Sequence, residues 1–179
     1  MPVALVNARV LTDEGFVDGR AVLIEGTRIR DVLPEDHPAC RSAEIRDLRG
    51  HLLLPGFIDT QVNGGGGVLF NDEPSVAAIA RIGRAHRRFG TAGFLPTLIS
   101  DDFHVVAQAI SAVREAIETG VPGVLGIHIE GPFLNVERKG VHDPEKLREL
   151  DESALDMLTS LRNGRTLVTL APERTTPPA

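Results

Sequence analysis

Hydrophobic and polar positions follow two different patterns along this chain of 179 residues. In the first part, short apolar runs rich in β-branched residues are separated by Gly, Asp and Pro, and no helical period is visible. This pattern predicts strands over residues 3–10, 21–25 and 28–33. We interpret residues 1–54 as a small β-strand subdomain of the sandwich type.

From residue 53 onward, strand-like runs alternate with stretches of helical period. Capping residues and apolar spacing predict helices over 74–89, from Asp101 or Asp102 to 119, and from Ser153 to about 162. Strands are predicted over 53–60, 93–98, 124–130 and 167–170. Strands that alternate with helices form parallel sheets, so an α/β fold is expected.

Four such βα units are half of a (β/α)8 barrel of the TIM type, which takes about 250 residues in all. We interpret residues 55–179 as the first four βα units of such a barrel, which is then incomplete. The Pro-rich segment 175–179 directly after a strand-like run favours the same interpretation. An open parallel sheet is the alternative, but no Gly-x-Gly-x-x-Gly motif follows the first strand.

Composition and charge argue against two classes of binding partner, nucleic acid and membrane. The net charge is −6 without a Lys/Arg-rich tract, which argues against nucleic acid. No apolar run approaches the roughly 20 residues that span a bilayer, so no membrane contact is expected. Cys40 is the only cysteine, so an internal disulfide is excluded. We expect a cytoplasmic protein that acts on a small molecule.

Polar side chains follow the first strand of the barrel-like part. Asp59, Gln61 and Asn63 alternate and therefore share one face of the strand, which we expect to be the barrel interior. Four consecutive glycines, 64–67, come next. Neutral amides are poor zinc ligands compared with His. The segment can also be a Gly-rich turn capped by polar side chains, or a backbone cradle for a phosphate.

The third strand carries the clearest candidate chemistry. It is apolar until Glu130, whose carboxylate lies between Ile129 and Phe133 and is costly to bury unless it is paired or bound to a cation. We therefore expect Glu130 to be a metal ligand, with a carboxylate at the wet mouth of the sheet as the alternative. His128 shares the face of Glu130 one layer deeper, where a hydrogen-bonded supporting histidine is expected rather than a ligand.

Several motifs resemble one enzyme family in order and spacing, over nearly the whole chain. They are Pro55-Gly56-Phe57-Ile58-Asp59, His128-Ile129-Glu130-Gly131-Pro132-Phe133, Lys139-Gly140-Val141-His142 and Thr169-Leu170-Ala171-Pro172-Glu173. The sequence resembles the N-terminal portion of the N-acetylglucosamine-6-phosphate deacetylase family of metal-dependent amidohydrolases. Many other amidohydrolases have His-x-His at Gln61 and Asn63, so this departure favours one metal ion over two.

The resemblance implies hydrolysis of N-acetylglucosamine 6-phosphate to glucosamine 6-phosphate and acetate by a water bound to one divalent metal. Zinc is expected first, with iron, manganese or cobalt as alternatives. By the same resemblance, Glu130 binds the metal, His142 contacts the substrate and polarises its acetyl carbonyl, and Val141 contacts the sugar through its backbone. Gln61, Asn63 and His128 would hold a metal-bound water or support the ligand.

The family's metal-binding histidines and its general acid/base Asp would lie beyond residue 179. No catalytic residue is therefore expected within this chain, and we expect the isolated chain to be inactive and the full-length parent to be a homodimer. One rival is another amidohydrolase, such as a cyclic amide hydrolase or an adenine deaminase-like enzyme. A second rival is a non-catalytic half-barrel, whose open strand edges predict dimers or aggregates.

Overall fold

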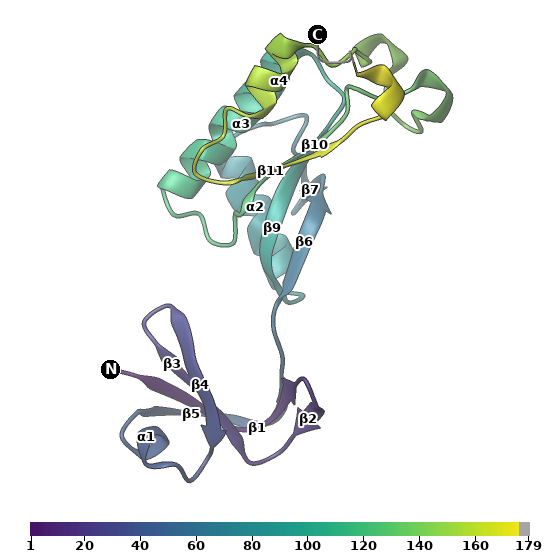
Figure 1. Cartoon of the computed structure of the whole chain (residues 1–179). Helices are drawn as coiled ribbons and strands as arrows, with labels where there is room; N and C mark the ends of the chain where they lie inside the picture. The colour runs from purple at the N-terminus through teal and green to yellow at the C-terminus, as the bar shows by residue number, and fades with distance from the viewer. Residues whose placement is uncertain (176–179) are drawn as a thin grey trace. The chain divides into compact units, whose positions relative to one another are not determined.

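The strands near the N-terminus form one sheet in the computed structural model, which describes residues 1–175 (Figure 1). The chain divides into two units, of which the first is Met1–Pro55. Its strands are β1 (Val3–Thr12), β2 (Gly15–Val17), β3 (Arg20–Glu25), β4 (Arg28–Pro34) and β5 (Glu44–Leu53). β1 pairs antiparallel with β2 and β3 and parallel with β5, and β3 pairs antiparallel with β4.

This single five-stranded sheet corrects the expectation of two facing sheets. The sequence did not predict β5 as a strand. Its residues are mostly charged and almost wholly exposed, so it has no apolar run that would indicate a strand. A short helix, α1 (Pro38–Arg41), also interrupts the predicted all-strand segment, and its Cys40 packs against Ala4 and Leu23. β5 is therefore held mainly by its backbone ladder to β1.

The second unit begins at Gly56 and is built on a parallel sheet of β6 (Phe57–Val62), β9 (Thr91–Ile99), β10 (Gly126–Glu130) and β11 (Arg165–Thr169). The strand order is β11-β10-β9-β6, so the strands lie side by side in the order of the chain. The strand predicted over 53–60 is present as β6, but its bounds are wrong, since β5 ends at Leu53 and β6 begins at Phe57. Pro55 has no N–H for a ladder hydrogen bond, and it breaks the run.

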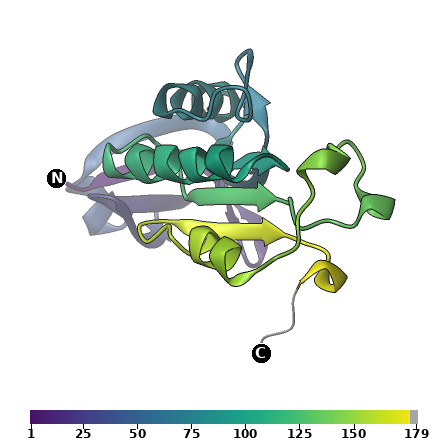
Figure 2. The same cartoon turned by 90° about the horizontal axis from the view of Figure 1, so that it is seen from above.

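Two long helices pack against the strands β9 and β10 of this sheet. α2 (Val76–Arg87) and α3 (Phe103–Glu118) pack on each other and on β9 and β10 (Figure 2). The core between them contains buried apolar side chains from both helices and strands, namely Ile79, Ile82, Phe94, Val106, Ile110, Ile127 and Ile129. Both predicted helices are present within three residues at each end, because their apolar stripes are the faces that pack.

The predicted helix caps are confirmed only in part. α4 (Glu152–Leu158) is capped by Asp151, whose Oδ1 accepts the Ala154 N–H at 2.8 Å, so the predicted Ser153 cap and the extension to 162 are wrong. At α3 the N-cap residue is Asp102, but its side chain makes no capping hydrogen bond. Short 3-10 helices complete the unit: η1 (Val136–Arg138), η2 (Pro144–Lys146) and η3 (Pro172–Arg174).

The glycine run after β6 forms a hairpin. β7 (Gly64–Gly65) and β8 (Val68–Leu69) pair antiparallel, and Gly66 and Gly67 form the turn with φ values of 63° and 85°. Two successive residues with positive φ suit the tight hairpin turn that glycine favours. The run is thus a hairpin with a tight glycine turn. Among residues 1–175, no helix has the length and apolar character needed to cross a bilayer.

Candidate functional site

A pocket of about 400 Å³ lies at the carboxyl ends of the parallel strands. Gln61 and Asn63 reach it from the end of β6, Glu130 from the end of β10, and Val141 and His142 from the loop that follows β10. In parallel βα folds the chemistry is found at this edge of the sheet. The structure therefore brings together five of the six residues that the sequence singled out.

Glu130 is the centre of this group. Its Oε2 accepts a hydrogen bond from Gln61 Nε2 at 2.9 Å, and its Oε1 lies 3.7 Å from His142 Nε2. The Glu130 side chain is 22% exposed, so the carboxylate is sheltered without being sealed from water. The amide of Gln61 and the imidazole of His142 thus flank the two carboxylate oxygens and reduce the cost of holding the charge there.

His142 is buried and fixed from several sides. Its Nδ1 lies 2.7 Å from Ser100 Oγ, and the Ser100 N–H donates to the same nitrogen at 3.3 Å. The Lys139 ammonium donates to the His142 carbonyl at 2.8 Å. Sequence reasoning missed Ser100, which directly follows β9. The only signal was that it is the first polar residue after a run of buried positions.

His128, the sixth singled-out residue, lies beneath the pocket and not in its lining. It is 3% exposed, with Nδ1 3.3 Å from Thr97 Oγ1 and Nε2 2.8 Å from Thr169 Oγ1. Burial lowers the pKa of His128 from its ordinary value, while the Glu130 carboxylate and a backbone hydrogen bond at Thr60 act in the opposite direction. The neutral imidazole is therefore favoured, and it connects β10 with β9 and β11.

Of three other residues, Val141 and Asn71 line the pocket and Asp59 does not. Val141 is exposed and borders the pocket, while Asp59 is not in its lining and instead accepts the Gln61 N–H at 3.1 Å. Asn71, which sequence reasoning also missed, lines the pocket; its Oδ1 accepts the Ile99 N–H and its amide donates to the Ile99 carbonyl. Asn71 therefore holds the end of β9 beside the hairpin.

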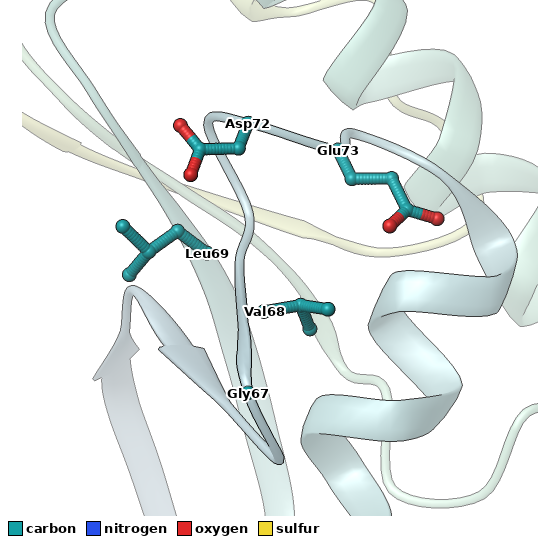
Figure 3. Close-up of a pocket in the computed structure, with 5 residues that line it drawn as sticks. All are labelled: Gly67, Val68, Leu69, Asp72 and Glu73. Atoms are coloured by element: carbon teal, nitrogen blue, oxygen red, sulfur yellow. The ribbon is translucent and has the colours of Figure 1, made fainter.

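A second hollow lies beside the hairpin, lined by Gly67, Val68, Leu69, Asp72 and Glu73 (Figure 3). In this view Leu69 and Asp72 extend to one side of the connection, and Val68 and Glu73 extend to the other. Leu69 and Asp72 also line the pocket of Glu130. The segment from the end of β8 toward α2 therefore separates the two pockets, and Leu69 and Asp72 line both of them.

The donor set of the pocket does not make a complete metal centre. Residues 1–175 contain no cluster of three or more His, Cys, Asp or Glu side chains that could hold a metal ion. Glu130 offers one carboxylate, whereas catalytic zinc is usually bound by three protein ligands. The chemistry that these residues support by themselves is hydrogen bonding to a polar ligand and placement of the Glu130 and Asp72 carboxylates beside it.

Comparison with known proteins identifies relatives of this chain. The model of the amidohydrolase family matches residues 52–177. The N-acetylgalactosamine-6-phosphate deacetylase of Shewanella sp. (strain ANA-3) is 50% identical over 127 residues, which cover 70% of this chain and 32% of that protein. The N-acetylglucosamine-6-phosphate deacetylase of Haemophilus influenzae is 37% identical over 176 residues, which cover 98% of this chain and 46% of that protein.

A solved structure gives the same picture. The crystal structure of N-acetylglucosamine-6-phosphate deacetylase from Pasteurella multocida superimposes with a TM-score of 0.88 at 35% identity, over 97% of this chain and 46% of that one. The chain thus spans less than half the length of each of these three relatives. Because the family model covers most of its residues, the chain belongs to the amidohydrolase family and is a homologue of N-acetylglucosamine-6-phosphate deacetylase.

Proposed function

We propose that this chain contributes part of an active site that hydrolyses the acetamide of N-acetylglucosamine 6-phosphate to glucosamine 6-phosphate and acetate. The observation that carries the proposal is the convergence of Gln61, Glu130 and His142 on one pocket at the carboxyl ends of parallel strands. The names of the similar proteins support the same chemistry.

In this reaction water adds to the acetyl carbonyl carbon, the C–N bond breaks, and the nitrogen takes up a proton as acetate leaves. His142 would donate a hydrogen bond to the carbonyl oxygen, and Val141 would contact the sugar through its backbone. We propose Glu130 as one ligand of a divalent metal, with zinc as the first candidate, and Gln61 and Asn63 as residues that hold water beside it. His128 would support Glu130 from below.

We further propose that the parallel sheet is the first half of a (β/α)8 barrel. Support comes from four parallel strands in chain order, with helices in the connections. Among residues 1–175, β6 pairs only with β9 and β11 only with β10, so each has one open edge. The open edges fit a barrel in which further strands pair with β6 and with β11. We also propose that the parent enzyme is a homodimer.

The isolated chain is predicted to release no acetate from N-acetylglucosamine 6-phosphate above a protein-free blank. The physical reason is the single carboxylate ligand, because too few donors remain to hold and activate a metal-bound water. Acetate is measured with a coupled assay after the intact mass and metal content of the chain are checked. Acetate release at an enzymatic rate would contradict this prediction.

A chimera tests whether this half works when the rest of a barrel is present. Residues 1–179 replace the matching 176 residues of the Haemophilus influenzae deacetylase. The chimera is expected to release acetate, and Glu130→Gln is expected to lower the rate by more than the roughly 100-fold that loss of a supporting residue can cost. Glu137→Gln, at an exposed position in η1, is the matched control. A folded but inactive chimera would count against the proposal.

N-acetylgalactosamine 6-phosphate is a second candidate substrate, and the name of one relative supports it. The Shewanella relative is named for N-acetylgalactosamine 6-phosphate, which differs from the glucose compound only in the configuration at C4. Both sugars present the same acetamide and phosphate groups, so Glu130 and His142 would meet the same atoms in either. Parallel assays of the chimera with the two substrates decide between them through the ratio of kcat/KM values.

A further inference from the structure

Ser100 presents two groups to one nitrogen of His142. Its backbone N–H donates to Nδ1 at 3.3 Å, and its Oγ lies 2.7 Å from the same atom. Both residues are buried, with exposed fractions of 7% for Ser100 and 5% for His142. Gly131 leaves room for this contact, since a Cβ at that position would lie 2.2 Å from Ser100 Oγ.

This geometry selects one form of the ring. A neutral imidazole carries its proton on one nitrogen, and the other nitrogen accepts. The Ser100 N–H can donate to Nδ1 only if that atom is unprotonated. Among the hydrogen bonds of residues 1–175, this N–H has no other acceptor. A proton on Nδ1 would therefore leave a buried backbone N–H without a partner, which native structures avoid.

We propose that Ser100 is a positioning residue that keeps His142 in the tautomer with its proton on Nε2, so that an N–H donor faces the pocket. Nε2 is the atom on the Glu130 side of the ring, 3.7 Å from Oε1. An amide carbonyl oxygen only accepts hydrogen bonds, so a neutral imidazole can donate to it through Nε2 only in this tautomer. The identity of that acceptor, the acetyl oxygen of the substrate, rests on the proposed function, whereas the tautomer does not.

The Ser100 hydroxyl makes the shorter contact, and the backbone N–H remains in every variant. Ser100→Ala is therefore expected to leave Nδ1 with one long hydrogen bond, and the second tautomer should become populated. Ser100→Thr keeps a hydroxyl and is expected to restore the wild-type ratio. Ser111→Ala makes the same change at an exposed position in α3 and is expected to change nothing.

The experiment is long-range ¹H–¹⁵N correlation spectroscopy on the intact chain with labelled histidines, at a pH above the ordinary histidine pKa of about 6.5. The signals of His142 are assigned by their loss in His142→Gln. The expected wild-type result is an unprotonated Nδ1 and a protonated Nε2. Unchanged His128 signals in Ser100→Ala show that the fold is retained.

Two results would overturn the proposal: a wild-type His142 with its proton on Nδ1, or a folded Ser100→Ala with wild-type tautomer populations. Neither measurement needs a substrate or turnover. An inactive chimera with the expected tautomer would therefore remove only the proposed function. An active chimera with the opposite tautomer would remove only the role of Ser100.

Discussion

A single hydroxyl group connects the strands beneath the pocket. Thr97 Oγ1 accepts the Val62 N–H of β6 at 2.8 Å, donates to the Leu95 carbonyl at 3.1 Å, and lies 3.3 Å from His128 Nδ1 of β10. Thr97 is fully buried, so water cannot replace these contacts. These are the contacts of a structural threonine near the end of a buried strand.

Thr97→Val is predicted to destabilise the second unit by about 1–3 kcal/mol, because the isosteric change leaves the buried Val62 N–H without an acceptor. Urea unfolding measures the change in the free energy of unfolding. Thr60→Val, at an exposed position in β6, is the control and should stay within about 0.5 kcal/mol of wild type. Equal effects of the two substitutions would contradict the prediction.

The sequence predicted the residues that line the pocket better than the residues that hold them in place. The face shared by Gln61 and Asn63 and the acidic end of the third strand pointed to this edge of the sheet, and both follow from strand periodicity. The contact of Ser100 with His142 depends on the loop after Gly131 folding back over β9. Such a contact between residues 42 positions apart leaves no periodic signal.

At the scale of elements, the start of α3 is stabilised by an ion pair in place of a cap. Lys146 of η2 bonds the Asp102 carboxylate and lies 3.7 Å from Asp101. The hydrogen bond from Lys146 lowers the pKa of Asp102, and the same bond raises the pKa of Lys146. The contact therefore links the loop after β10 to the helix that packs beneath it.

This pair predicts a defined pH dependence. A carboxyl with a lowered pKa stabilises the fold above its unfolded pKa of about 3.9 and stops doing so as the pH falls through the folded value. An ammonium with a raised pKa stabilises below about 10.4, and this is lost as the pH rises through its folded value. The Tm difference between wild type and Lys146→Gln should thus be steady from about pH 5 to 10 and shrink below about pH 4.

Arg138→Gln, at an exposed position in η1, is the control for this measurement. It removes one positive charge from the same loop without touching Asp102, so its Tm difference should stay small. A Lys146→Gln difference that persists undiminished at pH 2 would show that the carboxylate is not involved. Added salt should weaken the effect, since the two groups remain partly exposed.

Elements with a strong apolar period were predicted from sequence, and elements without one were not. α2, α3 and β9 bury one face or both, so their patterns carry the information. β5 is mostly exposed and is defined by its partner β1, while β7 and β8 are two residues each. The glycines of β7 fit because Gly65 lies against His86 of α2, a tertiary contact that local sequence does not encode.

At the scale of the whole molecule, the open edges of the parallel sheet predict self-association. Ile58 on β6 is 65% exposed and Leu167 on β11 is 40% exposed. Each edge strand presents unpaired backbone groups together with apolar side chains. Light scattering at increasing concentration should show dimers or larger species. Ile58→Lys and Leu167→Lys should shift the population toward monomer, because a charge on an edge strand blocks pairing.

Val136→Lys is the matched control for association, since Val136 is an exposed apolar residue of η1 and does not lie on an edge strand. It should leave the association unchanged. A wild-type chain that remains monomeric at high concentration, with its edge amides protected from exchange, would contradict the prediction.

The central position of β10 predicts that the two sides of the pocket differ in how often their backbone opens. β10 is paired on both sides and buried from Gly126 to Ile129, whereas residues 131–149 contain only short 3-10 turns. Amide protons of β10 should exchange with deuterium only when the unit unfolds, while those around His142 exchange through smaller openings. The strand that carries Glu130 is therefore expected to open far less often than the loop that carries His142.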